Sequence, residues 1–191
     1  MAGLTGILGG AFDPPHLGHV ALARAAIEEL DLDALEVAVV ADPGHKGVAT
    51  PAETRLALAR LAFADVPEST IELDHHARTV DFLEERLPEN AIFLMGADEL
   101  ADFPDWKRPD RVLELVQLGV ARRPGVPENI LRETLASLVA PDRVLFFDLD
   151  PIAVSSSQVR ERVRRGESIE GLVPPAVADE IERLGLYATG E

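Results

Sequence analysis

No cysteine occurs in the chain, and basic residues are scarce, with 18 lysines and arginines against 34 aspartates and glutamates. Without cysteine there can be neither a disulfide framework nor a thiolate metal site, so nothing points to an oxidising compartment. The stretch from Met1 to Gly10 lacks the basic and apolar segments of a signal peptide, and no apolar run approaches the roughly 18 residues of a membrane span. These absences predict a soluble, cytoplasmic protein without a membrane partner.

The deficit of basic residues gives a formal net charge of −16 at pH 7. Non-specific nucleic-acid binding takes most of its affinity from a basic surface, so this charge argues against a nucleic-acid partner. Anionic substrates would instead require the few basic residues to gather locally, and two clusters exist, Arg160 to Arg165 and the pair Arg122 and Arg123. Taken alone, such clusters are more often solvated faces that balance acidic neighbours.

The remaining composition is that of an ordinary globular protein, with 47% hydrophobic residues, 27% charged residues, 14 prolines and 14 glycines. A chain of 191 residues can bury about 70% of the surface that its unfolded form exposes. No internal repeat, low-complexity tract or linker divides it. We therefore expect a single domain over residues 1–191, in which residues 152–191 form a C-terminal helical portion.

Short apolar runs alternate with longer amphipathic segments along the whole chain. The runs that predict strands are Leu4 to Leu8, Leu35 to Val40, Thr70 to Leu73, Ala91 to Met95, Leu118 to Ala121 and Val144 to Phe147. The segments that predict helices are Gly18 to Leu30, a helix beginning at Thr50, Thr79 to Leu87, Pro109 to Val116, Pro127 to Leu138, Ser156 to Arg165 and Pro175 to Leu184. This alternation predicts an α/β fold with an open, doubly wound parallel sheet, Rossmann-like, and C-terminal helices. Ligands of such sheets bind at the carboxyl ends of the strands.

The helix that begins at Thr50 has the clearest start signal. Thr50 is a candidate N-cap, Pro51 suits the first helical position, and Glu53 is placed as a capping-box glutamate.

The first predicted strand runs directly into the sequence Gly9-Gly10-Ala11-Phe12-Asp13-Pro14-Pro15-His16-Leu17-Gly18-His19, which a helix follows at once. Glycines after a first strand allow a ligand to approach the backbone closely, and a helix N-terminus offers unpaired N–H groups to an anion. This is the layout of a phosphate site, although neither a Walker motif nor a Gly-x-Gly-x-x-Gly motif is present. His16 and His19 can donate hydrogen bonds to phosphoryl oxygens. The alternatives are that His16 is a turn residue and His19 a surface residue; for a zinc site, no cluster of suitable spacing supplies the other ligands.

A second candidate phosphate motif is Val154-Ser155-Ser156-Ser157-Gln158-Val159-Arg160. Hydroxyl and N–H groups at a helix start, with an arginine one turn later, can hold the outer phosphates of a nucleotide. Serines before a helix are more often simple N-caps.

Together these two motifs resemble the two halves of the site of the H-x-G-H nucleotidyltransferase superfamily. The stretch Gly9 to His19 is similar to its H-x-G-H region, and Ser155 to Arg160 is similar to its Ser-Ser-x-x-x-Arg segment. Within the superfamily, the sequence Gly96-Ala97-Asp98-Glu99-Leu100 with Phe103, Trp106 and Pro109 resembles a segment of the nicotinate mononucleotide adenylyltransferases. Shorter similar pieces are His45-Lys46, Thr79-Val80-Asp81, Ala121 to Gly125, and Val173-Pro174 through Gly185-Leu186-Tyr187.

This resemblance implies an enzyme of NAD biosynthesis that moves AMP from ATP to nicotinate mononucleotide. The residues that it implies as catalytic are His16, His19, Lys46 and Arg160. Those that it implies for ATP binding are Gly9, Gly10, Ala11, Phe12, His16, Gly18, His19, Gly96, Asp98, Ser155, Ser156 and Arg160. Those that it implies for acceptor binding are Asp13, His45, Lys46, Thr79, Trp106 and Arg123, and Arg78 beside Thr79 is added as a candidate for its charge. Trp106 would lie against the pyridine ring, Asp98 near the adenosine and Thr79 near the nicotinate carboxylate.

The chain departs from the family pattern at the acceptor side. Arg78 stands where the family often has tyrosine, and the stretch from Asp65 to Thr79 is short. Arg78 could pair with a carboxylate or phosphate of the acceptor, or face solvent. Ser157 and Gln158 stand where threonine and glutamate are common.

The implied reaction needs no general base, because an acceptor phosphate with a second pKa of about 6 is already mostly ionised at neutral pH. It would attack the α-phosphorus of ATP in line and release pyrophosphate. Mg²⁺ is expected as the cofactor, bound with ATP through water and substrate oxygens and not by a protein metal site. The alternatives are transfer to another phosphate acceptor, such as phosphopantetheine, and a non-catalytic nucleotide-binding protein. A homo-oligomer is compatible with the sequence.

Overall fold

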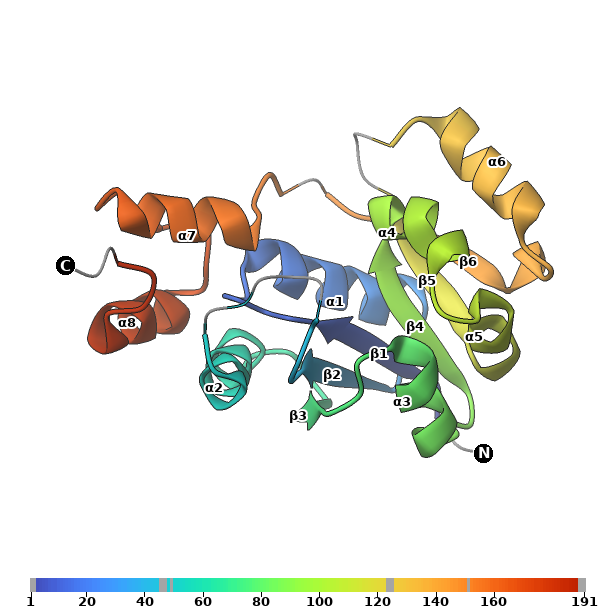
Figure 1. The fold of residues 1–191 in the computed structure, drawn as a ribbon, viewed down its shortest axis with the longest axis horizontal. Helices are drawn as coiled ribbons and strands as arrows, with labels where there is room; N and C mark the ends of the chain where they lie inside the picture. Colours follow the sequence, from blue (N-terminus) through green and yellow to red (C-terminus); the bar gives the residue numbers. More distant parts are fainter. Residues whose placement is uncertain (1–2, 45–47, 49, 123–125, 151, 189–191) are drawn as a thin grey trace.

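The computed structural model of the chain describes residues 3–44, 48, 50–122, 126–150 and 152–188. Its centre is a six-stranded sheet with the strand order β3-β2-β1-β4-β5-β6, in which every neighbouring pair is parallel (Figure 1). The strands are β1 (Thr5–Gly10), β2 (Ala34–Val40), β3 (Ser69–Asp74), β4 (Ala91–Gly96), β5 (Gln117–Arg122) and β6 (Val144–Asp148). The predicted doubly wound parallel sheet is confirmed, with its topological switch point between β1 and β4.

Eight α-helices connect or follow these strands in the described part of the chain. They are α1 (Leu17–Glu29), α2 (Ala52–Ala62), α3 (Thr79–Arg86), α4 (Ala97–Asp102), α5 (Pro109–Leu115), α6 (Glu128–Ser137), α7 (Ser156–Arg164) and α8 (Pro175–Leu184). Two short 3₁₀ helices, η1 (Phe103–Asp105) and η2 (Pro141–Arg143), complete the described elements. None of the described helices combines the length and the apolar character needed to cross a membrane.

Each face of the sheet has its own hydrophobic core, because successive side chains of a strand point to opposite faces. In β1, Leu8 belongs to the core beneath α1, α2, α7 and α8, whereas its neighbour Ile7 belongs to the core beneath α3, α4, α5 and α6. All six residues of β4 are buried, as expected of a strand covered on both faces. The C-terminal portion shares the first core through Val159 in α7 and Val177 in α8.

The structure differs from the sequence prediction in its short helices and in the start of α2. The prediction missed α4, whose six residues are too few for helical periodicity to show, and the two 3₁₀ helices. It also misassigned the start of α2, because Pro51 is the N-cap and the helix begins at Ala52. The predicted Thr50 cap is therefore wrong. Thr50 precedes the N-cap residue Pro51 and is buried, and its carbonyl accepts a hydrogen bond from Arg55 Nε at 3.0 Å.

Arg55, which the sequence analysis did not single out, is a charged residue in the interior, with 1% of its surface exposed. Its guanidinium donates four hydrogen bonds to backbone carbonyls: Nε to Thr50 (3.0 Å), Nη1 to Ala11 (2.6 Å) and Val40 (2.8 Å), and Nη2 to Ala41 (2.8 Å). Burial lowers the pKa of Arg55, and the negative charge of Asp13 opposes that shift. Arg55 thus joins the segments that follow β1 and β2 at the edge of the sheet where a ligand is expected.

Replacing Arg55 with methionine should lower the free energy of unfolding by about 3 kcal/mol, because one buried and three partly buried carbonyls lose their donors together. Urea denaturation followed by circular dichroism measures this change. Arg60→Met, on an exposed position of the same helix, is the matched control and should change stability by only about 0.5 kcal/mol. Equal effects of the two substitutions would contradict the role assigned to Arg55.

Candidate active site

The loop between β1 and α1 is built around Phe12, which is 2% exposed and has a φ of 49°. A side chain in this left-handed region is strained, so packing must hold it there. The Phe12 ring makes edge contacts with the rings of His19 (5.0 Å between centroids) and Phe63 (5.8 Å). Gly10 permits this packing, because a Cβ at that position would lie 3.0 Å from the Phe12 ring.

His16 and His19 lie against each other at the start of α1. His16 is the N-cap of the helix, and its backbone N–H donates to His19 Nδ1 at 3.1 Å. The two rings are stacked, with 3.6 Å between centroids and 22° between planes. A Cβ on Gly18 would lie 3.1 Å from the His16 ring and 3.3 Å from Val154, so a larger residue would require these neighbours to shift. The two predicted histidines are therefore brought together at the start of the helix, where His16 is the buried N-cap and His19 is partly buried.

The second predicted phosphate motif contacts the first directly. Arg160 Nη1 donates to the carbonyl of Asp13 at 2.6 Å, and Ser156 Oγ donates to the carbonyl of Pro14 at 2.8 Å. The loop is held further by the Leu17 N–H, which donates to the carbonyl of Leu172 at 2.9 Å. Segments more than 140 residues apart in the sequence thus form one surface at the N-termini of α1 and α7.

Ser155 has the capping role that serines before a helix often have. It is the N-cap of α7, and its Oγ accepts from the Gln158 N–H at 3.2 Å. Arg160 also donates from Nη2 to Ser157 Oγ at 3.2 Å, which directs its guanidinium toward the start of the helix. The other arginines of this cluster differ from Arg160, because Arg162 forms an ion pair with Glu167, and Arg164 and Arg165 form ion pairs with Glu161.

Asp13 is turned away from solvent, with 3% of its surface exposed, and its carboxylate accepts a hydrogen bond from the Tyr187 hydroxyl at 2.7 Å. Burial raises the pKa of Tyr187, so the hydroxyl keeps its proton and stays a donor. This bond ties the segment after α8 to the β1–α1 loop. The predicted acceptor residue Asp13 is therefore a loop anchor, and it is not among the residues that line the pocket described next.

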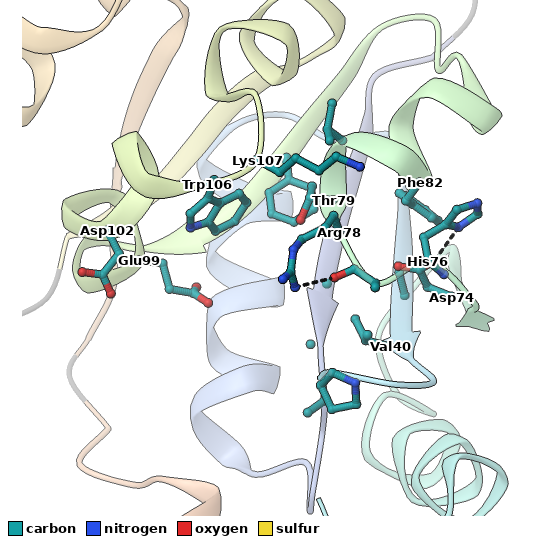
Figure 2. Close-up of a pocket in the computed structure, with 18 of the residues that line it drawn as sticks. Val40, Asp74, His76, Arg78, Thr79, Phe82, Glu99, Asp102, Trp106 and Lys107 are labelled. Atoms are coloured by element: carbon teal, nitrogen blue, oxygen red, sulfur yellow. Dashed lines mark hydrogen bonds and ion pairs between the residues drawn. The ribbon is translucent and has the colours of Figure 1, made fainter. Parts of the chain in front are cut away.

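A pocket of about 530 Å³ opens at the carboxyl ends of the strands (Figure 2). Predicted site residues that line it are Gly9, Gly10, Ala11, Arg78, Thr79 and Trp106. The other described residues that line it are Ala38, Val40, Pro43, Asp74, His76, Ala77, Val80, Phe82, Phe93, Glu99, Asp102, Asp105 and Lys107. The pocket thus contains residues of both predicted groups. Gly9, Gly10 and Ala11 were predicted for ATP, and the others were predicted for the acceptor.

Trp106 forms one wall of the pocket, held by Phe93 in an edge contact (6.0 Å between centroids, 86°) and by Phe103 in a tilted one (5.3 Å). Figure 2 shows Trp106 with Glu99 and Asp102 on one side and Asp74 with His76 on the other, while Arg78 extends between them. Arg78 Nη1 donates to the carbonyl of Ala77 at 3.0 Å. A pocket that holds both an indole and a guanidinium suits a flat ring that carries an anionic group.

Two side chains of this pocket that carry a basic group, Lys107 and His76, were not predicted from the sequence. Lys107 donates to both carboxylate oxygens of Asp81 (2.8 and 2.9 Å), a bond that lowers the pKa of Asp81 and links the segment after η1 to α3. His76 binds Asp74 and Glu85 with its two ring nitrogens, at 2.8 and 3.0 Å. Only the position of Lys107 beside the Trp106 motif could have indicated it, and no pattern in the sequence pairs His76 with carboxylates on two different elements.

Several predicted residues lie outside the lining of this pocket. They are Phe12, Asp13, His16, Gly18, His19, Gly96, Asp98, Ser155, Ser156 and Arg160. Gly96 ends β4 and is the N-cap of α4, where its N–H donates to Glu99 at 3.2 Å, and Asp98 is exposed in the first turn of that helix. The predicted residues His45, Lys46 and Arg123 lie outside the described part of the chain.

Known proteins resemble this chain over nearly its whole length. The model of the cytidylyltransferase-like family matches residues 7–162. Curated relatives carry the name "Probable nicotinate-nucleotide adenylyltransferase". The protein from Exiguobacterium sibiricum is 37% identical over 96% of this chain and 98% of the relative, and the one from Bordetella petrii is 39% identical over 95% and 97%. The one from Thermus thermophilus is 38% identical over 95% of this chain and 98% of the relative.

Solved structures show the same fold at lower identity. The nicotinic acid mononucleotide adenylyltransferase of Plasmodium falciparum, complexed with NaAD, superimposes with a TM-score of 0.78 at 18% identity, covering 97% of this chain and 98% of that one. Its complex with APC gives a TM-score of 0.75 at 19% identity over the same shares of both chains.

Proposed function

The chain belongs to the nicotinate-nucleotide adenylyltransferases within the cytidylyltransferase-like family, and from this membership we propose that it transfers the adenylyl group of ATP to the phosphate of nicotinate mononucleotide. The products are nicotinate adenine dinucleotide, a precursor of NAD, and pyrophosphate. One observation carries the proposal: Gly9 and Gly10 at the end of β1, with Ala11 after it, line a pocket whose other walls hold Trp106, Arg78 and Thr79.

We assign the phosphates of ATP to the surface where α1 and α7 begin. Both helix N-termini present backbone N–H groups and the positive end of a helix dipole, which favour an anion. The contacts of Arg160 with Asp13 and of Ser156 with Pro14 support this assignment, because they hold the two N-termini side by side. Gly96 and Asp98, at the start of α4, are proposed for the adenosine.

The hydrogen bond between the two histidines also fixes the chemistry of His19. Its Nδ1 accepts from the His16 N–H at 3.1 Å, so the neutral ring carries its proton on Nε2. An Nε2–H is a suitable donor to the α-phosphate oxygens, on which negative charge grows as the acceptor attacks. His16, stacked against this ring, holds its plane in place and is proposed as the second donor.

The proposed reaction is an in-line displacement. An oxygen of the acceptor phosphate bonds to the α-phosphorus of ATP, the bond between the α-phosphorus and the oxygen that bridges it to the β-phosphorus breaks, and pyrophosphate leaves with that oxygen. The nucleophile is already ionised at neutral pH, so the protein needs to position it and not to deprotonate it. His16, His19 and Arg160 are proposed to stabilise the developing charge, together with Lys46, which lies outside the described residues.

Within the residues that the structure describes, no group of three or more histidine, aspartate or glutamate side chains is arranged to hold a metal ion. We propose that Mg²⁺ would enter with ATP, because this ion keeps much of its water shell and binds phosphate oxygens readily. When bound, it neutralises phosphate charge. The described residues contribute by holding the phosphates that bind it, through the N-termini of α1 and α7.

For the acceptor, we propose that the pyridine ring lies against Trp106 and that its carboxylate is received by Arg78 and the start of α3 at Thr79. A pyridinium ring is cationic, so the face of an indole attracts it beyond simple apolar contact. Arg78, the N-cap of α3, is the described basic side chain that Figure 2 shows extending into the middle of the pocket.

Substituting His19 with alanine should lower turnover by about a hundredfold, since one donor to the transition state is lost while the fold remains. Pyrophosphate release under saturating ATP and acceptor measures turnover. His75→Ala is the matched control, because His75 is exposed and does not line the pocket. Near-normal turnover in His19→Ala would remove His19 from the reaction.

Arg160→Ala should weaken the binding of ATP by roughly tenfold or more, because a charge-assisted bond to a phosphate is lost. Calorimetric titration with a non-hydrolysable ATP analogue measures the affinity. Arg164→Ala, four residues further along α7 and paired with Glu161, should leave the affinity unchanged. If both variants bind the analogue like the parent protein, Arg160 serves the loop contact alone.

Nicotinate mononucleotide should react faster than its amide analogue by several powers of ten, because the amide leaves donors of the pocket without their anionic partner. Arg78→Ala should reduce this preference, whereas Arg132→Ala, on an exposed part of α6, should preserve it. The comparison requires rates of pyrophosphate release with both acceptors and with phosphopantetheine. Equal rates with acid and amide, or reaction with phosphopantetheine only, would refute the acceptor assignment.

A further inference from the structure

The loop between β3 and α3, residues 75–78, carries Arg78 to the pocket and ends where Thr79 begins the helix. Its conformation depends on His76, which binds groups on both sides of the loop. The His76 backbone N–H and its ring Nδ1 both contact Asp74 Oδ1 at 2.8 Å, at the end of β3. Its ring Nε2 contacts Glu85 Oε2 at 3.0 Å, in α3.

The two contacts differ in their surroundings. Asp74 is 6% exposed, and its backbone carbonyl accepts from the Ala41 N–H at 2.7 Å, which connects it to the end of β2. Glu85 is 74% exposed at its side chain, so its contact with His76 is the weaker one. The His76 ring also makes an edge contact with Phe82 of α3 at 6.1 Å between centroids.

We propose that His76 is a positioning residue for the acceptor: as an imidazolium it ties the β3–α3 loop to Asp74 and to Glu85, and so fixes Arg78 and Thr79 in the geometry that receives the acceptor. Only the imidazolium can donate from both ring nitrogens, whereas neutral imidazole donates from one. Loss of the ring proton therefore releases one of the two ties. This inference rests on the proposed function.

Asp74 and Glu85 are the acidic partners of His76, and the other charged side chains near it bind elsewhere. In α3, Asp81 is paired with Lys107, and Arg86 is paired with Glu36 of β2 and Glu72 of β3. From its own loop, Arg78 donates to the carbonyl of Ala77, and His75 is exposed. The hydrogen bond to Asp74 raises the pKa of His76, with smaller support from Glu85.

The direction of the pH effect follows. Below its ordinary pKa of about 6.5, His76 is charged and both ties are made. As the pH rises through the raised pKa, the proton is lost, one tie is released and the acceptor binds less tightly. The acceptor phosphate is already ionised above a pH of about 7, so its own titration does not obscure this change.

The single tryptophan of the chain makes the test independent of turnover, because Trp106 lines the pocket and its fluorescence reports acceptor binding. The experiment titrates nicotinate mononucleotide into the parent protein, His76→Ala, His76→Asn and the exposed control His75→Ala, at pH values from about 7 to 9. Steady-state kinetics of the same proteins give kcat and the KM values for ATP and for the acceptor.

His76→Ala should raise both the Kd and the KM for nicotinate mononucleotide by about tenfold, while kcat and the KM for ATP stay near those of the parent. Asparagine retains a donor to Asp74 without a titrating group, so His76→Asn should recover part of the affinity and show a Kd that does not vary with pH. His75→Ala should match the parent. The parent Kd should rise with pH.

An unchanged Kd in His76→Ala would overturn the inference, and so would a pH dependence in His76→Asn equal to that of the parent. If His76→Ala does not fold, as judged by circular dichroism, the comparison of the parent with His76→Asn decides alone. Failure of the proposed function has a different signature, because the parent protein itself would then form no dinucleotide from this acceptor.

Discussion

The buried guanidinium of Arg55 is the interaction on which the geometry of the candidate site depends. Where parallel strands end, backbone carbonyls lose their ladder partners, and burying them without donors costs free energy. Arg55 supplies donors to the carbonyls of Thr50, Ala11, Val40 and Ala41 from a single side chain. The carbonyls at the ends of β1 and β2 are therefore hydrogen-bonded to one side chain, and two of these residues, Ala11 and Val40, line the pocket.

The C-terminal portion holds the same loop from the other side. Arg160 and Ser156 bind the carbonyls of Asp13 and Pro14, and Tyr187 binds the Asp13 carboxylate. The loop is thus fixed between α2 beneath it and the segments around α7 and α8. For the proposed reaction, which depends on positioning and charge stabilisation, these hydrogen bonds serve to hold the loop in place.

The sequence predicts those features of the structure that have a local pattern, and it does not predict contacts between distant segments. Strands and long helices were predictable because their patterns repeat, and the pairing of His16 with His19 follows from their spacing on one helix start. Arg55 was not predictable, because a buried arginine in an amphipathic helix has the same sequence pattern as an exposed one. The two ties of His76 require β3 and α3 to be placed together first. Trp106 and Thr79 were placed at one site by the family resemblance and not by periodicity.

The central claim is that the acceptor phosphate attacks the α-phosphorus of ATP on this protein, and an isotope experiment tests it most directly. Nicotinate mononucleotide labelled with oxygen-18 in its phosphate is incubated with ATP and Mg²⁺, and the products are analysed by mass spectrometry. The account predicts a dinucleotide that retains all of the label, with one labelled oxygen bridging the two phosphorus atoms, and unlabelled pyrophosphate. Label in the pyrophosphate, or no dinucleotide at all, would contradict it.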